Sequence, residues 1–343
     1  MKWMIYGATG YTGELIVHHA KRMGYRPILA GRNKAKIEVL ANRVDMPWRA
    51  FGLDDVDTIA SQLEDVDLVV HCAGPFEDTA APMLQACLRA KTHYLDITGE
   101  ISVFELAHSL RKEADAAGII ICPGVGFDVI PTDCIAARLN AQMPNATHLT
   151  LGFDSSSRMS RGTALTGIRR LHLGGAVREN GDIKNVPLAF KTRRINFGDG
   201  EKLAMTIPWG DVATAFYSTG IPNIEVYVPA SPNLVKRMQR MNWVRFAFKF
   251  SALRRQLEKK VSNAPAGPEQ KERAANYTWV WGEARNAAGD VITIRQKVLN
   301  GYELTSRGAV ELAIYILRNQ LSPGYYTPSR LYGAKLIDRF LVD

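Results

Sequence analysis

The sequence predicts an α/β protein in which a doubly wound parallel sheet is followed by an α+β domain on a mixed or antiparallel sheet. In the first third of the chain, short apolar runs alternate with amphipathic helical segments, as in parallel strands joined by helical crossovers. A turn with glycine at every third position separates the first apolar run from the first helix. After about residue 145 the runs lengthen, alternate polar and apolar residues and are separated by Pro and Gly turns, which indicates a second kind of sheet.

The length of 343 residues favours two domains, and a hydrophobic content of 46% can fill a core in each. We expect a first domain over residues 1–125 and a second over residues 126–322. A tail over residues 323–343 remains, and its return to the first domain is one option.

The composition indicates where in the cell the protein is expected and which kinds of binding site it can have. No apolar stretch is long enough to span a membrane, and the glycine turn begins too early for a signal peptide, so we expect a cytoplasmic protein. The four cysteines lack CxxC spacing, which predicts reduced thiols and no metal site. The net charge of +9 suits an anionic ligand, a membrane surface or nucleic acid.

The first domain is expected to contain six strands and five helices in alternation. Each apolar run is short enough for a strand, and most of the intervening segments have one polar face. The strands are expected at residues 2–6, 26–31, 48–53, 66–74, 93–99 and 118–124. The helices are expected at residues 12–23, 34–44, 55–63, 76–90 and 101–116.

The first turn has the sequence and context of a dinucleotide-binding turn, because it follows a predicted strand and opens a predicted helix. Glycine permits positive φ and lets backbone approach a pyrophosphate, which the N–H groups of the helix N-terminus then receive. The alternative is a plain glycine-rich turn. The residues expected to contact the cofactor here are Gly7, Ala8, Thr9, Gly10, Tyr11, Thr12 and Gly13.

The residue after the second strand predicts the choice of cofactor. An acidic side chain at this place binds a ribose hydroxyl, whereas an arginine accepts the extra phosphate of NADP. The sequence places Arg32 here, followed by Asn33, and no carboxylate occurs before Glu38. A guanidinium pairs with phosphate in a bidentate manner, so we expect NADP(H) rather than NAD(H). The alternative is that Arg32 only ends the strand in solvent.

In an open parallel sheet, ligands bind outside the carboxyl ends of the strands. The loop after the fourth strand, Cys72, Ala73, Gly74 and Pro75, is therefore expected to line the cofactor site. Asp96 and Asp128 follow the fifth and sixth strands, and burial could raise their pKa values into the range of a proton donor or acceptor. Each also fits a helix cap or a turn.

Two other reaction classes leave little trace in the sequence. A short-chain dehydrogenase carries Tyr-x-x-x-Lys, and no tyrosine here has a lysine four residues later. A semialdehyde dehydrogenase needs a nucleophilic cysteine with a base nearby. Cys122 ends the sixth strand, but no partner histidine can be assigned, so this stays a minor alternative.

Taken together, these segments resemble the saccharopine dehydrogenase-like oxidoreductases, including the group of trans-acting enoyl reductases. The resemblance covers both halves of the chain, through "GATGYTG", "AGRN", "HCAGPF", "YLDITGE", "PGVGFDVIPTD", "SRGTALTG", "YTWVWGEARNAAGD" and "GYELTSRGAVELA" among others. It implies a Rossmann-type NADP domain and a second domain that supplies substrate contacts and often a dimer interface. It also implies hydride transfer to or from a small or lipid-borne substrate.

One stretch of the second domain is a candidate for substrate binding. The segment "SSSRMSRGTALTG" leads from a predicted strand into a helix, which places Ser160, Arg161 and Thr163 at a helix N-terminus suited to an anion. Ordinary capping of the helix by Ser160 explains the same residues equally well.

A basic amphipathic helix is expected over Leu234–Lys260, which holds nine Lys or Arg residues and one acid, Glu258. Aromatic and aliphatic residues recur at helical spacing and widen its apolar face. Helices of this kind lie in anionic membrane interfaces, but one packed on its own domain has the same pattern. Nucleic-acid binding has no supporting motif.

The sequence thus predicts an NADP(H)-dependent oxidoreductase that acts on an enoyl, imine or carbonyl substrate and forms a homodimer, with possible peripheral contact to a membrane. Because no acid–base pair is evident, a cofactor-binding sensor or scaffold without turnover is the alternative.

Overall fold

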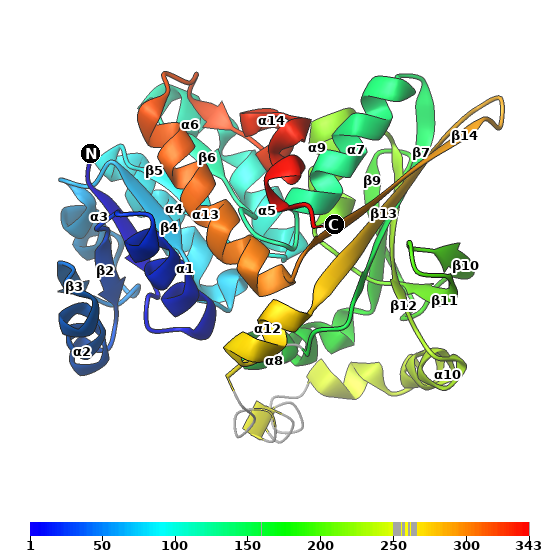
Figure 1. The fold of residues 1–343 in the computed structure, drawn as a ribbon, viewed down its shortest axis with the longest axis horizontal. Helices are drawn as coiled ribbons and strands as arrows, with labels where there is room; N and C mark the ends of the chain where they lie inside the picture. The colour runs from blue at the N-terminus through cyan, green and yellow to red at the C-terminus, as the bar shows by residue number, and fades with distance from the viewer. Residues whose placement is uncertain (159, 250–254, 256–257, 260, 262–265, 343) are drawn as a thin grey trace. The chain divides into compact units, whose positions relative to one another are not determined.

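The computed structural model describes residues 1–342 except 159, 250–254, 256–257, 260 and 262–265. The chain divides into two compact units, each built from two separate stretches (Figure 1). Unit 1 contains Met1–Ile130 and Gly301–Leu336, and unit 2 contains Pro131–Asn300 and Ile337–Asp343. Residues 301–322, expected in the second domain, therefore belong to the first unit.

Unit 1 is built on a seven-stranded sheet in which every strand pair is parallel, in the order β15-β6-β5-β4-β1-β2-β3. The chain reverses its direction of winding between β1 and β4, which makes this the topological switch point where ligands bind in such sheets. The strands are β1 (Trp3–Tyr6), β2 (Ile28–Gly31), β3 (Trp48–Ala50), β4 (Leu68–His71), β5 (His93–Asp96), β6 (Ile120–Cys122) and β15 (Gly324–Tyr325).

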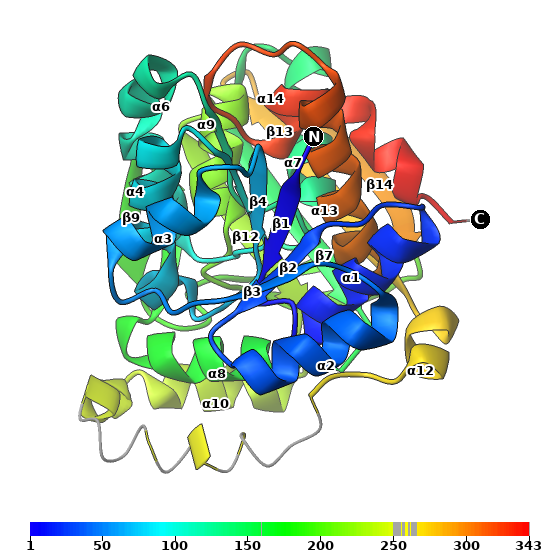
Figure 2. The ribbon, with the colours of Figure 1, turned by 90° about the vertical axis from the view of Figure 1, so that its left-hand side faces the viewer.

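Helices cover both faces of this sheet, with α1, α2 and α13 on one side and α3, α4 and α6 on the other (Figure 2). Parallel strands buried on both faces consist of apolar residues almost throughout, and β1, β2 and β4 are buried at every position. The helices are α1 (Tyr11–Arg22), α2 (Lys34–Val44), α3 (Val56–Leu63), α4 (Phe76–Ala90), α5 (Ile101–Ser109), α6 (Arg111–Ala117), α13 (Gly301–Arg318) and α14 (Pro328–Tyr332).

Unit 2 is built on an eight-stranded mixed sheet whose main path is β10-β11-β12-β7-β13-β14, with β8 paired to β12 and β9 paired to β8. The β12–β7 pair is parallel and the other pairs are antiparallel. The strands are β7 (Ala146–Ser155), β8 (Gly175–Glu179), β9 (Asp182–Val186), β10 (Thr192–Asn196), β11 (Glu201–Thr206), β12 (Asn223–Pro229), β13 (Tyr277–Asn286) and β14 (Val291–Leu299). Both sheets confirm the predicted fold class.

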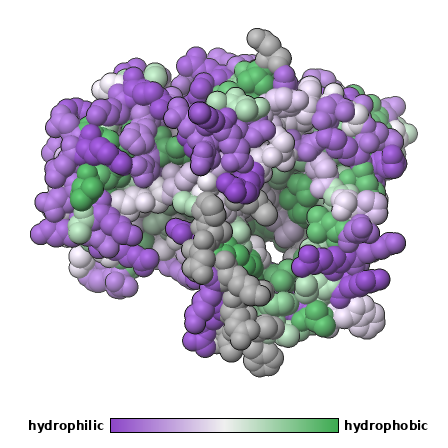
Figure 3. Space-filling model, turned by 60° about the horizontal axis from the view of Figure 1, so that its bottom comes forward, coloured by the Kyte–Doolittle hydropathy of each residue, from purple (hydrophilic) through white to green (hydrophobic). Residues whose placement is uncertain are grey.

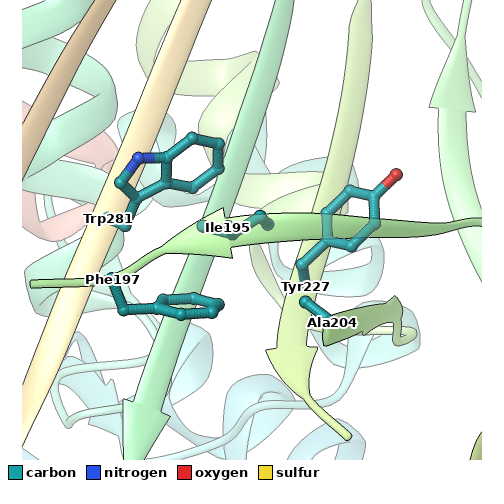
Figure 4. Close-up of a cluster of buried hydrophobic side chains, with 5 residues drawn as sticks. All are labelled: Ile195, Phe197, Ala204, Tyr227 and Trp281. Carbon is teal, nitrogen blue, oxygen red and sulfur yellow. The ribbon is translucent and has the colours of Figure 1, made fainter. Parts of the chain in front are cut away.

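Alternation along β13 assigns the two faces of the sheet in unit 2. Trp281 packs in a buried cluster with Phe197 and Tyr227 (Figure 4). The next residue, Gly282, faces α7, where an added Cβ would meet Ile135 at 2.4 Å. The described helical segments of unit 2 are α7 (Ile130–Gln142), α8 (Arg161–Arg170), η1 (Leu171–Leu173), α9 (Asp211–Thr219), α10 (Pro232–Met241), η2 (Arg245–Lys249), α12 (Gln270–Ala275) and η3 (Ala334–Phe340), the last crossing the unit boundary.

Within the described part of the chain, none of the helices combines the length and the apolar character that a membrane crossing requires.

Candidate functional site

The turn after β1 is shaped by glycines that leave no space for side chains. Gly7 has a φ of 81°, and a Cβ there would lie 2.7 Å from the Ala73 nitrogen. A Cβ on Gly13 would lie 2.3 Å from the Gly7 carbonyl oxygen. Gly7 therefore allows the turn to pass against the loop after β4, and Gly13 allows α1 to pack on the turn.

Gly10 is exposed and needs a different explanation, because the only contact an added Cβ would meet is the Gly7 carbonyl oxygen at 3.2 Å. It precedes α1, whose N-terminus receives no side-chain cap from Gly10. The N-termini of α2 and α3 are capped by Asn33 and Asp55, and the Glu100 carboxylate accepts the first N–H groups of α4. A bound pyrophosphate requires a bare backbone at the turn and an N-cap residue without a side chain, and Gly10 provides both.

Arg32 follows β2 at the same edge of the sheet. Its side chain is exposed and makes no hydrogen bond or ion pair with any residue that the structure describes. The guanidinium is near enough to lower the pKa of Tyr6, which burial nevertheless raises to about 12. Asn33 has a separate task, because its side chain accepts the Lys36 N–H at 3.0 Å as the cap of α2. Arg32 is thus held near the glycine turn with its charge uncompensated.

The loop after β4 lies against the glycine turn, as the Gly7–Ala73 contact shows. The Cys72 N–H donates to the Tyr6 carbonyl at 2.8 Å and extends the β1–β4 pairing by one residue. The Cys72 thiol is half-buried, and burial raises its pKa, so it is not a reactive thiolate at neutral pH. Gly74, exposed, precedes Pro75, which opens α4. The loop offers mostly backbone to a ligand.

Asp96 is fully buried, and all of its described contacts are structural. Its carboxylate accepts the Tyr94 hydroxyl at 2.7 Å, the Thr98 N–H at 3.0 Å and the Gly124 N–H at 2.8 Å. Burial raises its pKa to about 6, although these donors oppose the change. The carboxylate joins the end of β5 to the loop after β6. This arrangement makes Asp96 a positioning residue rather than a group that reaches a substrate.

Asp128 lies in the loop after β6 and is half-buried. Its carboxylate packs on Gly99, where a Cβ would lie 2.5 Å from Oδ2. It makes no hydrogen bond or ion pair among the described residues. Burial, and then the nearby Glu100 carboxylate, raise its pKa to about 7. Of the two predicted aspartates, only Asp128 has both an uncommitted carboxyl group and a pKa near neutrality.

Helix α13 completes this edge of unit 1 and was absent from the predicted site. Thr305 accepts the Phe127 N–H through Oγ1 at 2.9 Å, and its methyl group fills the space beside Gly126. The Tyr302 ring meets the Tyr11 ring edge to face at 5.2 Å. The start of α13 therefore fixes the loop that carries Asp128 and contacts the glycine turn. In the sequence, the segment "GYELTSRGAVELA" contributed only a resemblance to a family. Its residues do not indicate that the helix packs at the sheet edge of unit 1.

The remaining candidates are the three predicted substrate-binding residues, which belong to unit 2, and Cys122, which belongs to unit 1. Ser160 accepts the Thr163 N–H at 3.2 Å and so caps α8 in unit 2, while Arg161 is the first residue of that helix. The structure does not bring these three residues into unit 1. Cys122 is fully buried in β6, which opposes the alternative of an accessible nucleophile there.

The basic segment is shorter as a helix than predicted, because α10 ends at Met241. The Asn242 side chain pairs with both backbone groups of Leu188, at 2.8 and 3.1 Å. The 3₁₀ segment η2 follows over Arg245–Lys249. Much of the rest of Leu234–Lys260 lies outside the described residues.

Known proteins resemble this chain in two ways. The family model of the saccharopine dehydrogenase NADP binding domain matches residues 3–122. The trans-acting enoyl reductase of Mycobacterium tuberculosis is 30% identical over 141 residues, which cover 38% of this chain and 33% of that protein. The saccharopine dehydrogenase-like oxidoreductase of Rattus norvegicus is 28% identical over 150 residues, which cover 38% of this chain and 35% of that protein.

The match thus spans about a third of the length of these relatives. The apo histidine-tagged saccharopine dehydrogenase (L-Glu forming) from Saccharomyces cerevisiae has a similar fold, with a TM-score of 0.66 over 99% of this chain and 98% of that one at 12% identity. The glycine turn, the order of strands and the matched residues coincide in one region. Over residues 3–122 this chain is similar to the saccharopine dehydrogenase NADP binding domain family.

Proposed function

We propose that this chain is an NADP(H)-dependent oxidoreductase whose cofactor binds at the carboxyl edge of the sheet in unit 1. The single observation that carries the proposal is the exposed turn at Gly10, which leaves α1 without a cap from its N-cap residue, with Arg32 beside it and no described partner for Arg32. In this reading the substrate is a small or lipid-borne enoyl, imine or carbonyl compound. The names of the relatives favour this class of reaction.

The residues present fit the cofactor. The turn Gly7–Gly10 and the first N–H groups of α1 would receive the pyrophosphate, since Gly10 provides no side-chain cap. Arg32 would pair with the 2′-phosphate, and the loop Cys72–Pro75 would contact the rest of the nucleotide through its backbone. When bound, the nicotinamide supplies the hydride, which no side chain can provide.

Asp128 would handle the proton of the same reaction. With a pKa of about 7, a large fraction of this carboxyl group is protonated at neutral pH, so it can donate a proton to a substrate atom or accept one from it. The loop is fixed by Thr305, which limits movement of the carboxyl group. Asp96, with its three donors, holds the neighbouring backbone in place.

Cofactor choice is tested by titrating the protein with NADPH and with NADH. In Arg32→Ala, the affinity for NADPH should fall by about 10- to 100-fold because a charge-assisted contact is lost. The affinity for NADH should change by less than about threefold. Lys112→Ala, an exposed residue of α6, is the matched control and should bind both as the wild type does. Equal losses for the two nucleotides in Arg32→Ala would refute this account.

Catalysis is tested with panels of enoyl, imine and carbonyl compounds, by following oxidation of NADPH. Asp128→Asn should retain NADPH affinity and lose about 100-fold or more of turnover. The wild-type rate should follow a group with a pKa of about 7, and this dependence should vanish in Asp128→Asn. Tight binding of NADPH without turnover on any panel would instead indicate a sensor or scaffold.

A further inference from the structure

One exposed surface of unit 2 carries charges that the proposed function does not use. The α10 surface consists of residues from α10, from the turn after it and from η2, and we define it as Lys236, Arg237, Arg240, Trp243, Val244 and Phe246. We propose that the α10 surface binds membranes that contain anionic lipids. Figure 3 shows apolar side chains reaching the surface in this part of unit 2.

The packing of α10 determines which side of the helix faces the protein and which side carries the exposed cations. Val235 is buried with Ala189, Met205 and Ala230, and Met238 packs against the same cluster. Residues three apart share one face of a helix, so this pair is the inner face. Lys236, Arg237 and Arg240 fall on the opposite side at 100° per residue, and all three are exposed.

None of the residues that the structure describes compensates these cations. Lys236, Arg237 and Arg240 make no ion pair or hydrogen bond with the residues that the structure describes. Residues 232–249 contain no acid at all. The three side chains line a hollow of about 620 Å³ together with Met241 and Val244. Uncompensated positive charge beside apolar groups is complementary to anionic headgroups above acyl chains.

Exposed apolar side chains follow the cations directly. Trp243 is 90% exposed, Val244 57% and Phe246 55%. Aromatic rings at such positions are enriched at the interface between water and lipid. Arg245 holds the segment in place, because its guanidinium donates to the His172 carbonyl at 2.6 Å and lies 4.4 Å from the Phe246 ring centre. Nucleic acid would also complement the positive charge. It would stack on Trp243 but would leave the exposed aliphatic side chain of Val244 without a contact of its own.

The test is co-sedimentation of the full chain with vesicles of phosphatidylcholine alone and with phosphatidylcholine–phosphatidylglycerol mixtures. Wild type should bind only the mixtures, and more weakly as salt rises. The triple variant Lys236→Gln, Arg237→Gln, Arg240→Gln should bind about 100-fold more weakly, from about fivefold for each cation. The double variant Trp243→Ser, Phe246→Ser should bind at least about tenfold more weakly.

A second triple variant, Lys21→Gln, Lys112→Gln, Lys335→Gln, changes the net charge equally at exposed positions of unit 1. It should bind vesicles within about threefold of wild type. All variants should bind NADPH as the wild type does, so the result is independent of the proposed function. Absence of binding to the mixtures at low salt, or equal losses in the two triple variants, would overturn the proposal. The proposal would also be overturned if the same residues bound a DNA oligonucleotide and did not bind vesicles.

Discussion

Charged groups are treated in opposite ways at the sheet edge of unit 1 and on the sheet face of unit 2. At the edge of unit 1, Arg32 and Asp128 have no described partners. On the face of unit 2, which has a hollow of about 510 Å³, Arg193 binds Glu283 through two hydrogen bonds of 3.0 and 2.9 Å and Lys191 binds Glu225. A concave polar surface is therefore a weaker sign of a ligand site than uncompensated charge held by rigid backbone.

The largest effect should come from the backbone of the edge in unit 1. Gly7→Ala places a Cβ against the Ala73 backbone at a φ of 81°, and we expect it to lower the free energy of unfolding by about 3 kcal/mol or more. Gly24→Ala is the control, because its φ of 78° is similar but nothing lies within 4 Å, so about 1 kcal/mol is expected. Urea denaturation measures both, and equal losses would deny that the contact matters.

The next effect concerns the carboxylate that holds this edge together. Asp96→Ala leaves the donors of Tyr94, Thr98 and Gly124 without their acceptor in a buried site, which should lower the free energy of unfolding by about 3 kcal/mol. Asp96→Asn keeps one acceptor oxygen and should lose about half as much. Thermal unfolding followed by circular dichroism distinguishes the two variants. If both were neutral, Asp96 would not position the loop.

Breaking an ion pair of unit 2 should cause a smaller loss of stability and should leave NADPH affinity unchanged. Arg193→Met should lower the free energy of unfolding by about 1–2 kcal/mol, because Glu283 then lacks its partner on a partly buried face. A double-mutant cycle with Glu283→Gln measures the coupling between the two side chains. NADPH affinity should not change in any member of the cycle. A loss of that affinity would mean that the paired face also serves the ligand.

The smallest effect has the opposite sign. The pKa of Asp128 is raised in the folded chain, so the folded state holds the proton that the unfolded state releases, and stability falls as pH rises from about 4 to about 7. Asp128→Asn removes this cost and should stabilise the protein by about 1 kcal/mol at about pH 8, after allowance for solvent screening. Calorimetry should show a smaller gain at about pH 5. Destabilisation at about pH 8 would indicate that the carboxylate has a partner.

Local pattern was sufficient for the parallel sheet and for the glycine turn. Strands β1, β2 and β4 are buried at every position, so each appears as an apolar run, and Gly7 and Gly13 stand where backbone contacts exclude a Cβ. Asp96 and Asp128 could not be told apart, because both follow strands. Their difference depends on the Tyr94 hydroxyl and the Gly124 N–H, which only the fold brings together.

Two further errors have the same origin in long-range contacts. Residues 301–322 were expected in the second domain, yet α13 packs on α1, and nothing in its own periodicity specifies that partner. The basic segment was expected to continue as a helix past Met241. The α-helix ends there, beside an Asn242 side chain that binds Leu188, a residue distant in sequence.

The return of α13 to unit 1 has a consequence for synthesis on the ribosome. Ile130 and Gly301 belong to the same compact unit, and all of Pro131–Asn300 is translated between them. Translation proceeds at roughly 5–20 residues per second. The first part of unit 1 is therefore synthesised on the order of 10–40 s before α13 and β15 emerge to cover α1 and β6. During that interval α1 lacks the helix that packs against it in the folded chain, whereas most of unit 2 emerges without a comparable gap.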